Sequence, residues 1–187
     1  MTYYSRGSEQ YVFGREELQE AINSSLAKLD AKKKVPAVPP DFTRYHSQSG
    51  LLTKFIYQYY KEALTNILPS LGTHSPISDK ALLIMFEGVP RDLFRVHKWR
   101  DDIVTLGEVP SEYIKEVSEG KLNYTWPVQV NKLLVEGNFD LILSIGQVVP
   151  HEVVGMANYN KNIFVGTGGP DDGKSRYSSK RSFKLCF

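Results

Sequence analysis

The sequence predicts an α/β protein with a mainly parallel, Rossmann-like sheet and helices on both faces. Three observations favour this class. Short apolar runs alternate along the chain with amphipathic helical stretches. The apolar run at residues 139–145 stops at Gly146, as a strand buried on both faces would. Polar residues also follow several predicted strands directly, and open α/β sheets bind their ligands at the carboxyl edge.

The length and composition fit one folded domain, or one domain and a fragment of another. The chain has 187 residues, of which 41% are hydrophobic and 24% charged, and its apolar runs are shorter than the roughly 18 residues that span a bilayer. The amino terminus lacks the apolar core of a signal peptide, so we expect a cytoplasmic protein without a membrane partner. Cys186 is the only cysteine, which rules out an internal disulfide and a Cys-based zinc site. The net charge of +2 is too small to indicate a nucleic acid partner.

The first elements are a helix and a short strand. From Arg15 onward, apolar residues recur every three or four positions up to Leu29, which predicts an amphipathic helix. Residues 35–38 read as a strand. Because Pro36 cannot donate a ladder hydrogen bond, we expect this strand at an edge of the sheet or Pro36 at its start.

The middle and last parts of the chain continue the alternation. Residues 51–64 predict a helix with a broad apolar face, followed by an extended piece at 67–68 and a helix over about 77–87 that Ser75 or Ser78 caps. The later elements are extended structure at 94–99 and 102–109, helices at 111–119 and 128–135, and strands at 139–145 and 163–165. Residues 1–169 form the predicted domain, and residues 170–187 read as a disordered or aberrant tail because they lack apolar periodicity.

The loop after the first strand contains Asp41, Thr43 and Arg44. An acid, a hydroxyl and a guanidinium at this position suit recognition of a carboxylate or phosphate, since arginine offers a planar fork of donors. The alternative is that these residues bind no ligand and serve only as an N-cap and a surface ion pair. A second loop places His74 directly before a helix, where it is either an acid/base group or a structural hydrogen-bonding residue.

The connection after the strand at 139–145 contains His151 and Lys161. Both are titratable and both follow a predicted strand end, which makes them site candidates, although a solvated loop would also explain them. A further polar cluster, residues 97–102, contains His97, and we interpret it as a structural network.

Two histidines in separate loops, together with an arginine, match the needs of a racemase. Such an enzyme takes and returns a proton or hydride on either face of one carbon, and therefore needs two acid/base groups on opposite sides of it. His74 and His151 are the candidates for this pair. Arg44 would hold the substrate carboxylate and fix its orientation.

The same residues carry a family resemblance. The segments PDFTR (40–44), GTH (72–74) and PHEVVGMANYNKNIFVGTGG (150–169) resemble the amino-terminal domain of the nickel-pincer lactate racemase family. The resemblance implies that His74 and His151 form the acid/base pair, and that Arg44, Thr43 and Asp41 contact substrate or cofactor. It also implies that Lys161 binds a nickel-pincer nucleotide covalently, and that hydride passes to this cofactor and back. The section at 97–120 is similar to sugar-acid relatives described as mannonate epimerases.

Two departures predict a truncated chain. The family has a nickel-binding histidine in a Lys-Ser-His context, whereas Lys174 and Ser175 are followed here by Arg176, which is always protonated and cannot ligate a metal. The family also continues into a second, carboxyl-terminal α/β domain. We therefore expect the cofactor-binding half of an enzyme for a small 2-hydroxy acid or sugar acid, inactive by itself and with no metal ligand assigned.

Two other classes of function were considered. A nicotinamide-dependent dehydrogenase is disfavoured because no G-x-G-x-x-G segment follows the first predicted strand. A non-catalytic module that binds a nucleotide or a protein partner stays open, because half of a site can bind without turnover.

Overall fold

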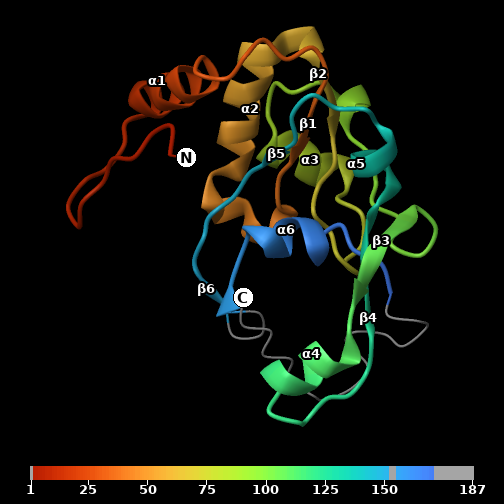
Figure 1. Ribbon diagram of the computed structural model, residues 1–187. Coiled ribbons are helices and arrows are strands. Elements are labelled where there is room, and N and C mark those ends of the chain that lie inside the picture. Colours follow the sequence, from red (N-terminus) through yellow and green to blue (C-terminus); the bar gives the residue numbers. More distant parts are fainter. Residues whose placement is uncertain (1, 152–154, 171–187) are drawn as a thin grey trace.

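The computed structural model of the chain describes residues 2–151 and 155–170. In these ranges a three-stranded parallel sheet is flanked by helices, and two antiparallel strand pairs accompany it (Figure 1). The predicted α/β class with a parallel sheet is therefore confirmed. Of the predicted tail, residues 171–187 lie outside the described residues, and the domain boundary stays a prediction.

The elements follow one another with short connections. The helices are α1 (Arg15–Leu26), α2 (Ser49–Tyr60), α3 (Asp79–Met85), α4 (Ser111–Val117), α5 (Lys132–Glu136) and α6 (Asn160–Phe164). The strands are β1 (Val35–Val38), β2 (Leu64–Ile67), β3 (Ile103–Val109), β4 (Trp126–Asn131), β5 (Leu143–Ser144), β6 (Pro150–His151) and β7 (Gly155–Met156). The 3₁₀ turns are η1 (Phe42–Ser47), η2 (Lys61–Ala63) and η3 (Arg91–Leu93).

The parallel sheet has the order β2-β1-β5, so β1 is its central strand. The edge position expected from Pro36 is wrong. The pairing of β1 with β2 shifts register between Val35 and Pro36. Such an irregularity interrupts the regular ladder at the residue that has no N–H to donate, which lets proline occupy a central strand.

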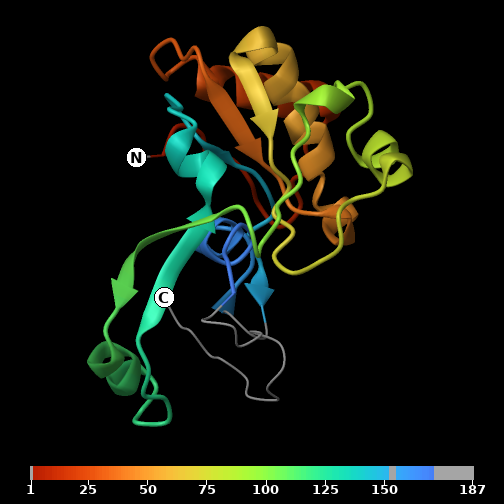
Figure 2. The same ribbon diagram turned by 90° about the vertical axis from the view of Figure 1, so that its right-hand side faces the viewer.

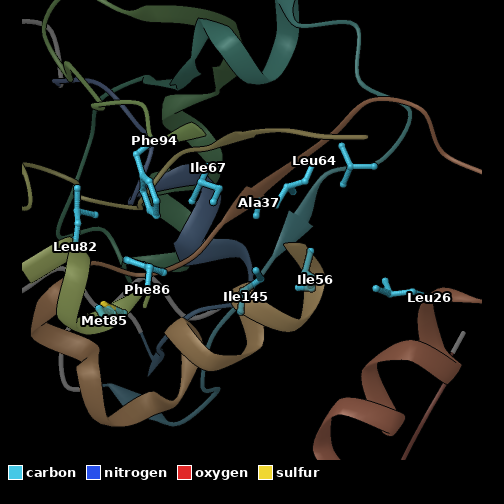
Figure 3. Packing of buried hydrophobic residues seen from close by; sticks show 11 residues of the cluster. Leu26, Ala37, Ile56, Leu64, Ile67, Leu82, Met85, Phe86, Phe94 and Ile145 are labelled. Carbon is cyan, nitrogen blue, oxygen red and sulfur yellow. The ribbon is translucent and has the colours of Figure 1, made fainter. Parts of the chain in front are cut away.

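Helices cover both faces of the sheet because successive side chains of β1 point to opposite sides. Val35 and Ala37 belong to a large apolar cluster with residues of α1, α2 and α3, and ten members of that cluster are labelled in Figure 3. Val38 belongs to a second cluster with Leu68 and with Leu134 of α5. The two clusters together fix the sheet between two helical layers.

The predicted strand at 139–145 is shorter and less buried than expected. Only Leu143 and Ser144 pair with β1, and Ile142 is 40% exposed whereas Ile145 is buried. This alternation is typical of a strand with one face to solvent. β5 is also an edge strand, since β1 is the one described strand that pairs with it. The prediction that this apolar run is a strand buried on both faces is therefore wrong.

The first half of the helix predicted at 128–135 is a strand in the structure. Residues 126–131 form β4, which pairs antiparallel with β3, and α5 begins only at Lys132. The Asn131 side chain accepts a hydrogen bond of 2.9 Å from the Leu133 amide and caps α5 there. The β3–β4 pair and α4 extend away from the parallel sheet (Figures 1 and 2).

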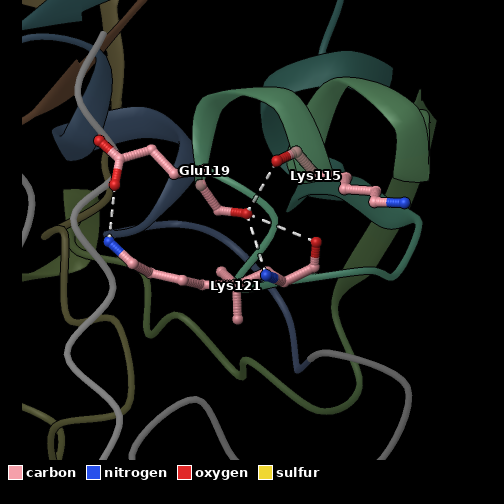
Figure 4. A network of polar contacts seen from close by, with 5 residues as sticks. Lys115, Glu119 and Lys121 are labelled. Atoms are coloured by element: carbon pink, nitrogen blue, oxygen red, sulfur yellow. Dashed lines mark hydrogen bonds and ion pairs between the residues drawn. The ribbon is translucent and has the colours of Figure 1, made fainter.

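Local polar contacts hold the end of α4 at the tip of this extension. The Leu122 amide donates to Ser118 Oγ over 2.9 Å, and Lys121 pairs with Glu119 over the same distance (Figure 4). The Gly120 amide donates to the Lys115 carbonyl over 2.7 Å, and Gly120 has a φ of +77°, as a helix-ending glycine does. The helix predicted at 111–119 is thereby confirmed, although it ends at Val117, and Gly120 lies in the turn that follows.

Three other expectations need correction. Residues 163–165, expected as a strand, belong to α6 and the turn after it. The helix expected to reach residue 64 ends at Tyr60, because Lys61 has a positive φ of 48° and Leu64 already begins β2. Residues 94–99 form no regular strand, although Phe94 bridges to Ile67.

The helices of the described ranges are all too short or too polar to cross a bilayer. The expected cytoplasmic location stays a prediction.

Candidate functional site

The carboxyl ends of the three parallel strands open onto one cavity of about 270 Å³. Figure 2 shows β1 and β2, the orange and yellow arrows, both directed toward α6 in blue. The cavity lies between the loops after these strands and α6. The six residues singled out in the sequence all line it: Asp41, Thr43, Arg44, His74, His151 and Lys161. They come together because parallel strands bring their carboxyl ends to the same edge.

Asp41 and His74 form a pair at the base of two neighbouring loops. One carboxylate oxygen of Asp41 accepts from the Thr43 amide over 3.0 Å and from the Thr43 hydroxyl. The other oxygen contacts Nδ1 of His74. Asp41 is buried, whereas the His74 side chain is 58% exposed. An aspartate bound to Nδ1 fixes the ring and leaves Nε2 as the nitrogen for acid/base work.

The two alternative interpretations of this loop can now be compared. Asp41 is the N-cap of η1, as one alternative predicted, but its partner beyond η1 is His74. His74 likewise has a hydrogen-bonding partner, and at the same time lines the cavity. Asp41 and His74 therefore each make a structural contact and also line the cavity.

Arg44 lies on η1 with its side chain exposed and lines the cavity. Its φ and ψ of −106° and 28° interrupt the helical turn. Within the described residues its guanidinium makes no ion pair or side-chain hydrogen bond, so its donors are available to an anion that enters the cavity.

His151 and Lys161 reach the cavity from different elements. His151 is in β6, where it pairs with Gly155 of β7. Lys161 is on α6, whose helical turn carries its side chain to the cavity wall. The carbonyl of Lys161 accepts from the amides of Val165 and Gly166 over 3.0 and 2.9 Å. His151 and Lys161 therefore line the cavity together with the Asp41–His74 pair, although they come from a later part of the chain.

Sequence reasoning missed several lining residues. Ser47, Ser70, Gln147, Asn158 and Asn162 also line the cavity. Asn162 is buried, and its side-chain amide donates to the Val38 carbonyl and to Ser144. The Asn-Lys-Asn order around Lys161 was a usable signal, but a polar residue in a short segment ordinarily indicates solvent exposure.

His97 lies outside the cavity, and its structural interpretation is confirmed. Its ring is 3% exposed, with Nε2 3.0 Å from the Gly168 carbonyl and Nδ1 3.0 Å from the Asn131 amide nitrogen. Because a carbonyl only accepts, Nε2 carries the proton and Nδ1 accepts from Asn131. Burial lowers the pKa of His97, while the hydrogen bond to Gly168 and the charge of Asp102 oppose this shift.

Known proteins resemble this chain in sequence and in fold. The family described as the lactate racemase N-terminal domain matches residues 8–173. A crystal structure of a protein from Thermotoga maritima is 26% identical with a TM-score of 0.72, over 86% of this chain and 41% of that one. The lactate racemase apoprotein from Thermoanaerobacterium thermosaccharolyticum is 24% identical with a TM-score of 0.56, over 81% of this chain and 33% of that one.

The second of these structures supports the fold alone, given its low identity. This chain spans less than half the length of either structure. No curated protein matches the chain.

Proposed function

Because the chain belongs to the lactate racemase N-terminal domain family, we propose that it is the cofactor-binding half of a 2-hydroxy-acid racemase or epimerase. The observation that carries this proposal is that six residues from separate parts of the chain line one cavity. Two histidines, an arginine and a lysine at the carboxyl edge of a parallel sheet suit an anionic substrate and an anionic nucleotide.

The residues present fit the organic part of the family's cofactor. Lys161 offers an amine for a covalent bond. The described residues contain no group of three His, Cys, Asp or Glu side chains that could hold a metal. When bound, the nickel-pincer nucleotide supplies the hydride acceptor.

His74 and His151 divide the proton transfers in this proposal. His74, oriented by Asp41, takes the hydroxyl proton of the substrate at Nε2, and His151 serves the mirror-image substrate. In one racemisation the histidine on the substrate's side would take the hydroxyl proton, and the other histidine would give a proton to the product hydroxyl. Two acid/base groups are needed because the two enantiomers present their hydroxyl groups in different directions.

Arg44 and Thr43 hold the substrate carboxylate in the same proposal. Arg44 supplies the positive charge and fixes the orientation of the reacting carbon. We assign Asp41 to the support of His74 rather than to the substrate, because its carboxylate would repel an acid and its oxygens already have partners.

The charge of the cavity supports the substrate class. Arg44 and Lys161 line it with positive charge, which suits the carboxylate of a small 2-hydroxy acid. A sugar acid of the mannonate type is the second candidate, on the resemblance of residues 97–120. The chain spans less than half the length of its longer relatives. In this proposal the part of them that it does not span completes the site, so we expect no turnover from this chain alone.

Covalent attachment at Lys161 is the test of this function. The chain is co-expressed with cofactor-making enzymes, and its intact mass is measured. We expect a cofactor-sized adduct on Lys161 that Lys161→Arg abolishes while the fold is kept, because a guanidinium cannot form the same bond. Lys54→Arg, at a lysine outside the cavity, is the matched control and keeps the adduct.

Each outcome has a consequence for the proposal. An adduct that persists in Lys161→Arg would remove this lysine from the cofactor site. Reversible nucleotide binding without an adduct would favour the non-catalytic binding module. Racemisation of lactate or epimerisation of mannonate by the isolated chain would contradict its assignment as an incomplete enzyme.

A further inference from the structure

Asn162 fastens the short helix α6 to the ends of two strands. Its side-chain nitrogen lies 2.7 Å from the Val38 carbonyl and 3.0 Å from Ser144 Oγ. Val38 is the last residue of β1 and Ser144 the last residue of β5. Because the Val38 carbonyl can only accept, the amide nitrogen must face it, which fixes the orientation of the side chain.

α6 depends on such contacts because it is too short to be stable alone. It has five residues and no side-chain N-cap, and the two residues before it, Asn158 and Tyr159, have positive φ angles of 54° and 55°. Isolated helices shorter than about 12–15 residues are marginal in water. Asn162 is the one residue of α6 that is buried, with 4% of its surface exposed.

The neighbour of Asn162 in α6 is Lys161, which lines the cavity. β1 leads directly into the loop of Asp41 and Arg44, and β5 leads into the connection toward His151. A side chain that joins α6 to both strand ends therefore sets where Lys161 stands relative to the other cavity residues. We propose that Asn162 is the positioning residue for Lys161, holding its amine at the strand-end cavity by the hydrogen bonds to Val38 and Ser144. This inference rests on the proposed role of Lys161.

The test measures the position of Lys161 by its reactivity and the anchoring of α6 by hydrogen exchange, with no cofactor present. The probe is pyridoxal 5′-phosphate, an anionic aldehyde that condenses with an amine to an imine and water. Borohydride then reduces the imine to a stable secondary amine, and peptide mass spectrometry gives the labelling of Lys161 relative to the exposed Lys80. Amide exchange is followed over residues 160–167.

Asn162→Ala is compared with Asn160→Ala, which removes the exposed asparagine on the other side of Lys161. In Asn162→Ala we expect amide exchange in residues 160–167 to quicken by about tenfold, as loss of buried hydrogen bonds allows. We expect the preference for Lys161 over Lys80 to fall several-fold. Asn160→Ala should leave both measurements at their wild-type values. Equal effects of the two variants, or no effect of Asn162→Ala, would overturn the inference.

Ser144→Ala is a second, milder variant that tests the same contact if Asn162→Ala does not fold. It removes one of the two acceptors of Asn162, at an exposed position, and should shift both measurements in the same direction by a smaller amount. If Asn162→Ala unfolds the chain and Ser144→Ala changes nothing, the inference is wrong.

Failure of the proposed function has a different signature. If the wild-type chain shows no preference for Lys161 while α6 exchange still responds to Asn162→Ala, then Asn162 anchors the helix but Lys161 is not a reactive site. The probe can also label Lys161 in preference to Lys80 in the wild type and in both Asn162→Ala and Ser144→Ala. In that case Lys161 is a reactive site, but Asn162 does not position it.

Discussion

We expect the buried His97 to make the stability of the protein depend on pH. The neutral ring donates from Nε2 to the Gly168 carbonyl and accepts at Nδ1 from Asn131, so it joins the turn after α6 to the end of β4. Protonation would place a second N–H against the Asn131 amide and a charge in a buried position. Its lowered pKa means that the folded state binds fewer protons than the unfolded state between the folded pKa and about 6.5, the ordinary value.

The sign and the size follow from this difference. The contribution of His97 is fully present above the unfolded pKa and is lost as the pH falls below about 6.5 toward the folded pKa. For one proton, the free energy of unfolding falls by at most about 1.4 kcal/mol per pH unit. His97→Ala would in addition leave two buried polar groups without this partner, at about 1–3 kcal/mol each, or roughly 2–6 kcal/mol in all.

Urea unfolding of wild type and His97→Gln between pH 5 and pH 8 isolates this contribution. Glutamine offers both a donor and an acceptor at similar reach but does not titrate, so the other histidines contribute equally to both proteins. We expect the stability difference between the two proteins to be constant above pH 7.5 and to shift against wild type below about pH 6.5. A difference that stays constant down to pH 5 would refute the argument. His97→Ala should be the least stable of the three proteins at pH 8.

Two packing predictions complete the set. In Gly166→Ala the new Cβ would lie 1.7 Å from Ser70 Oγ and 2.5 Å from a backbone carbonyl, so we expect a loss of about 1–3 kcal/mol in urea unfolding. Gly107→Ala, with nothing within 4 Å, should change stability by less than about 0.5 kcal/mol, and equal effects would contradict the close packing. Phe86→Ala removes a ring that is 2% exposed and should cost about 3–5 kcal/mol. Leu83→Ala on α3, 72% exposed, is its control, and a Phe86 loss below about 1 kcal/mol would count against the core assignment.

Local patterns were sufficient for much of the fold and for the list of site residues. The helix from Arg15, the strand at 35–38 and the cap at Ser78 were predictable because each depends on neighbours in the chain. The placement of polar residues after strand ends predicted one shared edge for Arg44, His74 and His151. All three line the same cavity, while their chemical roles stay predictions.

Other features were decided by partners distant in the sequence. Residues 128–131 fit a helical period, yet they form β4 because β3 is available to pair with them. Pro36 lies in the central strand because of a register shift that depends on β2. Residues 163–165 are apolar like a strand, but they pack as part of α6 and its turn, and Ile163 joins the cluster around Val38.

Within the site, the sequence by itself determined which functional groups are present, and the tertiary structure decided which of them touch. The pairing of Asp41 with His74 spans two loops, and the bonds of Asn162 to Val38 and Ser144 span three elements. No local pattern contains these contacts. They arise because hydrophobic burial on both faces of the sheet fixes the strands and helices in register, and side chains far apart in the chain then meet at hydrogen-bonding distance.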